Sequence, residues 1–127
     1  MIDQDMYQGI QRAFKESVSA EIQMASGGLQ RFVVHVPFTF TDGDHYMVVL
    51  RREDAMWVLS DEGHTLMHLS YDLTDFEFNE GTRREIIDRV VSAYGMENRN
   101  GELVLVIPEG RYGDELFSFI QAITRIT

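Results

Sequence analysis

The chain has 127 residues and a mass of 14.7 kDa, the size of one ordinary domain. Its 44% hydrophobic content predicts a globular core, and the absence of cysteine excludes disulfides, thiol catalysis and cysteine-ligated metal centres. Twenty-one acidic residues against eleven basic ones give a net charge of −10, which argues against direct binding of nucleic acid. No apolar run approaches the about 18 residues of a membrane span, and the first residues lack a secretory pattern. We therefore expect a cytoplasmic protein with one domain over residues 1–127.

The first predicted element is an amphipathic helix over Asp3–Met24. Apolar residues recur at every fourth position from Ile2 to Ile22, which is close to the helical repeat of about 3.6 residues. The segment Ser26-Gly27-Gly28 then ends the helix, because glycine readily adopts the left-handed conformation found after helix C-termini.

Three strands with short connections follow and predict an antiparallel meander. The first, Leu29–Phe40, alternates apolar and polar residues. Because proline cannot donate a ladder hydrogen bond, Pro37 predicts that this strand lies at a sheet edge or is unpaired on that side at Pro37. The second covers His45–Arg51. The third, Met56–Leu59, is apolar on both faces and is expected in the centre of the sheet.

The second half of the chain predicts two more strands and further helices. A short helical turn is expected within residues 60–69, and residues 71–81 show no clear period and predict a loop or a short edge segment. A capping-box pattern at Thr82 opens a helix that Gly95 ends, and Asn100-Gly101 predicts a tight hairpin turn. Asp114 opens the last helix. The expected fold is α+β: an antiparallel sheet, made of a three-strand meander plus a C-terminal hairpin, with helices packed on one face.

The negative charge is concentrated in the middle third of the chain. Residues 42–80 contain ten acidic residues and only two basic ones, Arg51 and Arg52, so this segment holds −8 of the total −10. One interpretation is a solvated face that keeps the protein soluble. The other is a surface that steers a basic partner protein into contact. For that second interpretation the predicted partner-binding residues are Asp42, Asp44, Asp61, Glu62, Asp72, Asp75, Glu77 and Glu80.

Carboxylates and imidazoles of the same region offer an alternative, a metal-dependent hydrolase or nuclease. Its residues would be Asp42, Asp44, Asp61, Glu62 and His64, since oxygen and imidazole ligands suit divalent metals. His64 and His68 are four residues apart and would share a helix face, but no third ligand is identifiable beside them. Asp61 also has a plainer interpretation as a cap of the following turn.

No complete catalytic pattern is present. The sequence has neither a phosphate-binding Gly-x-x-x-x-Gly-Lys loop nor a Gly-x-Ser-x-Gly elbow. The only lysine is Lys15 in the first helix, far along the chain from the acids that a nuclease of the restriction type would need beside it. We therefore predict no cofactor and no bound metal.

Several short motifs resemble one family of small bacterial and phage proteins. They are Val36-Pro37-Phe38, the Asp42-Gly43-Asp44 turn, the run from Trp57 to Leu66, and Gly101-Glu102-Leu103. Over about residues 16–126 the chain is similar to the family catalogued as domain of unknown function 1828, although Glu62 stands where that family often has Asp. The resemblance implies a bacterial or phage origin and no accepted activity.

The hypothesis favoured by these observations is a small acidic interaction protein without catalytic activity. Its partner would be a basic protein, in the concrete case a nucleic-acid-handling protein of a bacterial defence system that this chain inhibits. No membrane partner is expected. The oligomeric state stays open, and a homodimer is compatible with the sequence.

Overall fold

The structure, a computed structural model, describes residues 3–71 and 80–127. The helices and strands in this part of the chain are, in order, α1 (Gln4–Ala20), β1 (Gln23–Ser26), β2 (Arg31–His35), β3 (Val49–Glu53), β4 (Met56–Ser60), α2 (His64–Ser70), α4 (Thr82–Ala93), β5 (Glu97–Arg99), β6 (Glu102–Ile107) and α5 (Tyr112–Ile126).

The strands form one antiparallel sheet of six strands in the order β1-β2-β3-β4-β6-β5. Strand β4 lies in its interior, as its two apolar faces predict. Asn100 and Gly101 both have positive φ, 54° and 100°, as a type I′ turn requires, so the predicted C-terminal hairpin is confirmed.

The register divides the side chains between the two faces of the sheet. Phe32, Leu50, Leu59 and Leu105 stand opposite one another across β2, β3, β4 and β6, and therefore share one face. We call it the apolar face. The neighbouring row begins with Arg31 and Arg51 and belongs to the opposite face, which we call the charged face.

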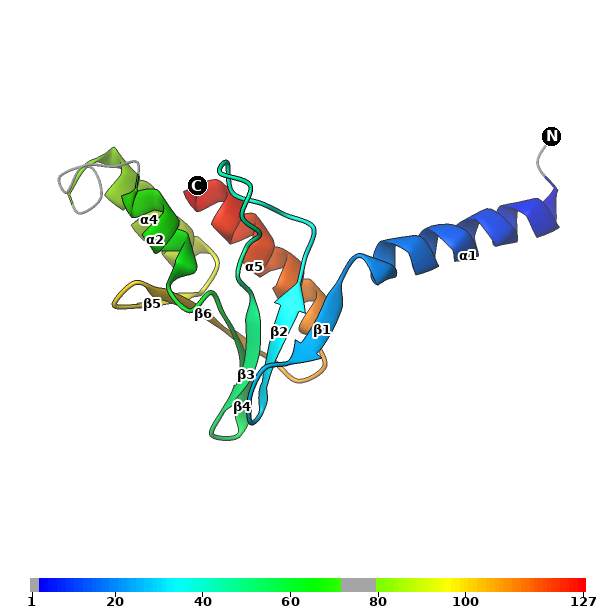
Figure 1. Ribbon diagram of the computed structural model, residues 1–127, viewed down its shortest axis with the longest axis horizontal. Helices are drawn as coiled ribbons and strands as arrows, with labels where there is room; N and C mark the ends of the chain where they lie inside the picture. The colour runs from blue at the N-terminus through cyan, green and yellow to red at the C-terminus, as the bar shows by residue number, and fades with distance from the viewer. Residues whose placement is uncertain (1–2, 72–79) are drawn as a thin grey trace.

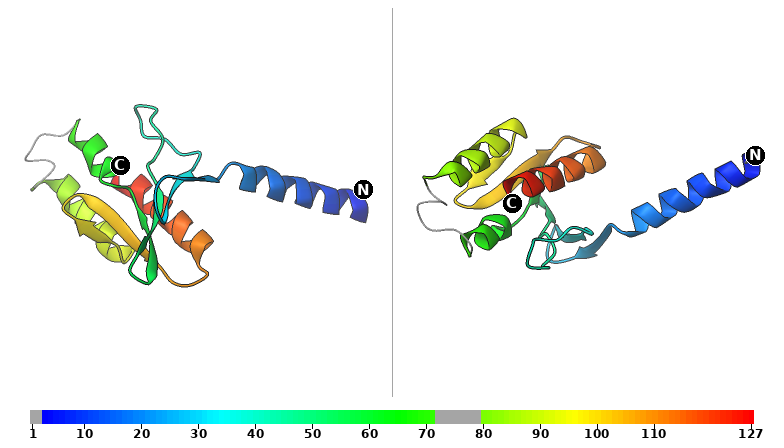
Figure 2. Two further views of the ribbon diagram at one scale, coloured as in Figure 1. Left: turned by 60° about the horizontal axis from the view of Figure 1, so that its bottom comes forward. Right: turned by 90° about the horizontal axis from the view of Figure 1, so that it is seen from above.

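The core lies between the apolar face and helices α4 and α5 (Figure 2). Ile87 of α4 and Phe119 and Ile123 of α5 are completely buried there, and Leu66 of α2 joins the same cluster. The predicted α+β fold, an antiparallel sheet with helices on one face, is confirmed for these elements. Its extent as one domain over residues 1–127 stays a prediction.

Several predicted element boundaries were wrong. The first helix ends at Ala20, and Gln23–Ser26, predicted as its last turn and its stop, forms the edge strand β1. Pairing with β1 moves β2 off the edge, and the strand ends at His35, so Pro37 lies outside the ladder and imposes no edge. The strand predicted second, over His45–Arg51, corresponds to β3, which runs over Val49–Glu53.

Two predicted helix starts also differ. Helix α4 has Gly81 as its N-cap and Thr82 as its first residue, and Gly81 has no side chain to accept a hydrogen bond, so the capping box predicted at Thr82 does not form. Helix α5 begins at Tyr112, two residues before the predicted Asp114.

Helix α1 stands apart from the rest of the molecule. It projects from the sheet at β1 with no other element beside it (Figure 1), and none of its residues is buried. The expectation that every helix packs on the sheet is therefore wrong for α1. None of the described helices combines the length and apolar character needed to cross a bilayer. The predicted cytoplasmic location stays a prediction.

Candidate functional site: the acidic turn

The acidic turn, residues 41–44, is held by hydrogen bonds to its own backbone. The Phe40 N–H donates to the Asp44 carbonyl at 2.8 Å, and the Gly43 N–H donates back to the Phe40 carbonyl at 3.0 Å. Gly43 has φ of 92°, a conformation that side-chain-bearing residues rarely adopt. The turn therefore presents Asp42 and Asp44 in a fixed arrangement.

His68, near the C-terminus of α2, closes the turn from the side. Its Nδ1 lies 2.8 Å from Asp42 Oδ2, and its Nε2 lies 3.9 Å from Asp44 Oδ2. The imidazole ring stacks on Phe40 with 4.1 Å between ring centres, while the Tyr71 ring meets it edge-on. Aromatic packing thus fixes the ring that orients the two carboxylates.

The two carboxylates of the turn remain exposed to solvent. The Asp42 and Asp44 side chains are 46% and 72% exposed. The Asp44 N–H donates to Asp42 at 2.9 Å, and this hydrogen bond, with a further contribution from His68, lowers the pKa of the Asp42 carboxyl. In the described part of the chain neither carboxylate forms an ion pair with Arg or Lys. Their charge is therefore available to an outside group.

Asp61, another predicted site residue, is completely buried and has a structural role. Its carboxylate accepts hydrogen bonds from the backbone N–H groups of Gly63 at 2.9 Å, Leu103 at 2.9 Å and Thr65 at 3.2 Å. It thereby joins the start of α2 to β6, and the capping role suggested by the sequence is present in this geometry. Burial raises the pKa of Asp61 despite these donors. With no exposed surface, Asp61 is unavailable to a partner.

Glu62, also a predicted site residue, belongs to an ion-pair network on the charged face. Arg31 binds the Glu62 carboxylate through two nitrogens, at 2.5 and 3.1 Å. Arg51 contacts Glu102 at 2.6 Å and Glu53 at 2.8 Å. These arginines lower the pKa values of the three glutamates. Much of the negative charge that the sequence assigns to this region is therefore neutralised inside the molecule.

The network was missed by reading the sequence because its members come from distant strands. Arg31, Arg51 and Glu102 are brought together by the pairing of β2 with β3 and of β4 with β6. Charged residues at alternate positions of strands, such as Arg51 and Glu53, were the available signal. Without the strand order, that signal could not show which charges meet.

The residues predicted for a metal-dependent hydrolase do not form one cluster. Among the described residues, the only group of three or more metal-ligating side chains with ligand atoms within 4.8 Å is Asp42, Asp44 and His68. Asp61 is bound to backbone N–H groups and Glu62 to Arg31, as described above. His64 lies at the opposite end of α2 from the turn. The structure thus replaces the predicted five-residue set by a three-residue one that includes His68.

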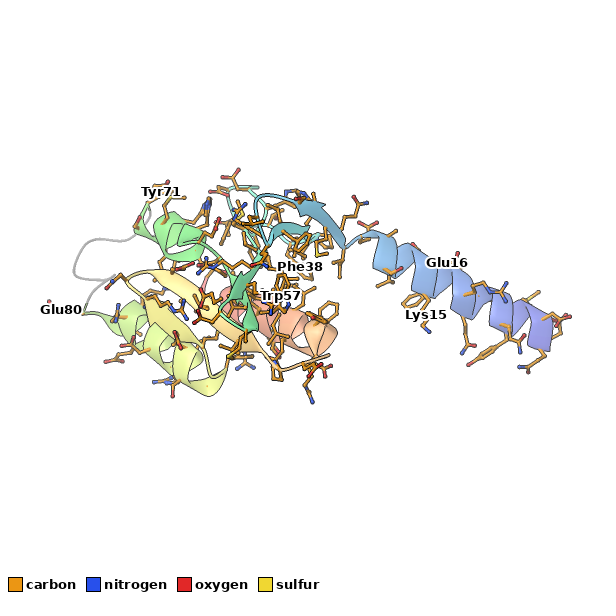
Figure 3. All side chains as sticks on the ribbon, turned by 90° about the horizontal axis from the view of Figure 1, so that it is seen from below. Lys15, Glu16, Phe38, Trp57, Tyr71 and Glu80 are labelled. Carbon is orange, nitrogen blue, oxygen red and sulfur yellow. The ribbon has the colours of Figure 1, made fainter. Side chains whose placement is uncertain are left out.

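The remaining predicted partner-binding residues follow α2. Asp72, Asp75 and Glu77 lie outside the described residues. Glu80 is exposed, and with Tyr71 it lies at the end of the molecule far from α1 (Figure 3). Since Tyr71 contacts His68, the acidic turn belongs to the same end.

Comparison with known proteins identifies the family. The model of the family described as "Domain of unknown function DUF1828" matches residues 36–126, and the chain belongs to this family. The match includes the acidic turn, His68 and the ion-pair network except Arg31, and it begins after α1, β1 and β2. Neither the curated proteins nor the solved structures contain a match.

Proposed function

For a member of a family whose description names no activity, we propose a binding role: this protein recognises a partner protein that has a basic surface. The observation behind the proposal is the acidic turn, where Asp42 and Asp44 are exposed, fixed by His68 and Phe40, and free of Arg or Lys partners among the described residues. Rigid, exposed carboxylates attract a basic surface and lose little side-chain freedom on binding it.

The partner's chemistry follows from the overall charge. A net charge of −10 repels nucleic acid but suits the groove of a protein that itself binds phosphates. In the concrete form of the proposal, the partner is a nucleic-acid-handling defence protein whose basic groove this chain occupies and blocks. Support comes from the charge, the small size and the exposed turn.

The test is retention of a partner on the immobilised full-length protein, eluted with a salt gradient and identified by mass spectrometry. Asp42→Asn/Asp44→Asn removes two charges from the turn, and Asp54→Asn/Glu109→Gln removes two exposed charges elsewhere. We expect the turn variant to lose the partner and the control variant to keep it. We also expect added duplex DNA to displace the partner, because both compete for the same groove.

A partner that stays bound at high salt, or that the turn variant still retains, would contradict the proposal. Electrostatic attraction between exposed groups is screened within about 8–10 Å at moderate ionic strength, so salt sensitivity is a necessary property of this interface.

A second candidate function, metal binding at the turn, is favoured by one observation. Asp42 holds His68 through Nδ1, which leaves Nε2 directed toward Asp44. A carboxylate that orients a histidine in this way is typical of metal sites. However, Nε2 and Asp44 supply only two ligands, so any ion would take most of its coordination from water and bind weakly.

This second candidate is tested by thermal unfolding with Mg²⁺, Mn²⁺ or Zn²⁺, since a ligand that binds only the folded state raises the melting temperature. A rise that disappears in His68→Gln would support the metal site. An unchanged melting temperature at millimolar metal would exclude it.

A further inference from the structure

Helix α1 carries an apolar stripe that has no contact with its own chain. Met6, Tyr7, Ile10, Phe14 and Val18 lie on one side of the helix and are between 47% and 70% exposed. The stripe from Met6 to Val18 is about 18 Å long at 1.5 Å per residue. Figure 3 shows the side chains of α1, including Lys15 and Glu16, projecting from the helix with no other element around them.

The same chain has an apolar groove that no helix covers. It lies beside α1's attachment point, on the apolar face of the sheet where β1, β2 and β3 extend past α5, and it encloses about 430 Å³. Trp57 is one of its lining side chains and lies near α5 (Figure 3). Met24 and Tyr112 on its rim are 56% and 48% exposed, so a large apolar surface stays uncovered. Its other lining side chains include Phe32, Leu50 and Leu116.

We propose that two copies of the chain form a reciprocal dimer in which α1 of each copy packs its apolar stripe into the groove of the other. Each copy contributes one helix and one groove, so a twofold axis satisfies both at once. This dimer uses residues remote from the acidic turn and is independent of the proposed partner-binding function.

The area involved suits a stable dimer. The exposed fractions of the five stripe residues correspond to about 500 Å² of surface, taking roughly 150–250 Å² for a fully exposed large side chain. The groove would lose a comparable area. If stripe and groove are both fully covered, two such contacts bury at most about 2,000 Å² in total, which reaches the range of about 1,200–2,000 Å² for specific interfaces.

The connection between α1 and β1 favours exchange over folding back. The Glu21 N–H donates to the Val18 carbonyl and the Ile22 N–H to the Ser19 carbonyl, both at 3.2 Å, so helical turns continue to the residue before β1. Only Glu21 and Ile22 separate α1 from β1, and both take part in these bonds. Covering its own groove would require α1 to break these bonds, whereas a second copy supplies its helix without that cost.

The mass of the full-length protein in solution is the first test, measured by light scattering during size-exclusion chromatography. We expect twice 14.7 kDa at micromolar concentration. Phe14→Asp should raise the dissociation constant by about 100-fold or more, because a charge replaces a central aromatic contact. The matched control Gln8→Asp places the same charge about 120° around the helix from Phe14, outside the stripe, and should leave the dimer intact.

The groove is tested separately with Tyr112→Asp, whose side chain is already half exposed and whose substitution should leave the fold intact. It should also dissociate the dimer. Mixing the Phe14→Asp and Tyr112→Asp proteins should restore part of the dimer, because one intact helix then meets one intact groove.

A short bis-maleimide cross-linker distinguishes the remaining arrangements, since the natural chain has no cysteine. Phe14→Cys/Tyr112→Cys should give a covalent dimer. A cross-linked monomer would mean that α1 folds back, and a covalent dimer from Phe14→Cys alone would mean that two α1 helices pack together; either overturns the proposal. A monomeric mass at all concentrations, or a dimer unaffected by Tyr112→Asp, would overturn it as well.

Discussion

Two regions of the molecule differ in how they treat their apolar side chains. The sheet with α2, α4 and α5 buries them, and the projecting helix α1 leaves them exposed. Every completely buried side chain among the described residues comes from the first region, from Val48 in the sequence to Ile126. Helix α1 has an equally regular apolar stripe and buries none of it. Since most helical stability in proteins comes from packing one face, α1 has the pattern of a packed helix without the packing. This contrast is what the dimer proposed above would explain.

The largest expected difference in stability is between two Phe→Ala substitutions, one in each region. Phe119→Ala empties a site in α5 that is completely buried and should lower the free energy of unfolding by about 3–5 kcal/mol. Phe14→Ala removes a side chain that is 70% exposed in α1 and should cost less than about 0.5 kcal/mol in dilute protein. Urea unfolding followed by circular dichroism measures both.

Protein concentration sharpens the same experiment. If a second copy covers Phe14, the loss caused by Phe14→Ala should grow as the protein is concentrated, while the loss caused by Phe119→Ala stays constant. A large loss for Phe14→Ala in dilute protein would show instead that α1 packs within its own chain.

Asp61 gives the next largest expected effect. Asp61→Ala leaves three backbone N–H groups at the junction of α2 and β6 without their acceptor, and we expect a loss of about 2–4 kcal/mol. Asp61→Asn keeps one oxygen as acceptor and removes the buried charge, so its loss should be smaller. Thermal unfolding of the two variants decides the point. Equal stability of Asp61→Ala and the unchanged protein would mean that the carboxylate is not the link between α2 and β6.

The sequence predicted the elements whose signals are local. The turn at Asn100-Gly101, the interior position of β4 and the cap at Asp61 each depend on residue types at adjacent positions. Strand β1 was missed because Ile22 continues the four-residue spacing of α1, so the periodicity concealed the change from helix to strand. The last turn of a predicted helix and a short edge strand are not distinguishable by period alone.

The candidate site was predictable only in part, because electrostatics depends on which charges meet. Asp42 and Asp44 were identified from the acidic turn, and their exposure agrees with a binding surface. Glu62 was grouped with them because it is near in sequence and acidic, but Arg31 neutralises it across the sheet. That contact depends on the antiparallel pairing of β2 with β3, a long-range property that no local pattern contains.

The charged face should make stability fall in acid. Glu53, Glu62 and Glu102 have pKa values lowered mainly by hydrogen bonds from Arg51 and Arg31. A lowered pKa means that the folded state binds protons less readily than the unfolded state, so these groups stabilise above about pH 4.5 and lose that contribution as the pH falls further. Asp61 has a raised pKa and acts in the opposite direction, but it is one group against three.

The pH dependence is checked by urea unfolding between pH 3 and pH 7. Arg51→Met should cost about 1 kcal/mol at neutral pH, as partly exposed ion pairs usually contribute at most that much, and should flatten the fall below pH 4.5. Arg84→Met, which removes a more exposed pair with Asp88 in α4, is the matched control and should leave the acid dependence unchanged. An unaltered acid dependence in Arg51→Met would mean that other carboxylates control it.

The smallest expected effect concerns Gly9, in the middle of α1. A side chain at this position would meet no atom within 4 Å, so Gly9→Ala changes only the helix propensity, by about 0.5–1 kcal/mol in favour of the helix. Because α1 buries none of its residues against its own chain, this gain should appear as increased helicity in dilute protein, with the unfolding of the sheet unchanged. Circular dichroism at 222 nm measures the first and tryptophan fluorescence of Trp57 the second. A shift of both by the same free energy would mean that α1 and the sheet unfold as one unit. A gain in helicity alone would show that α1 forms independently, ready to pack against a second surface.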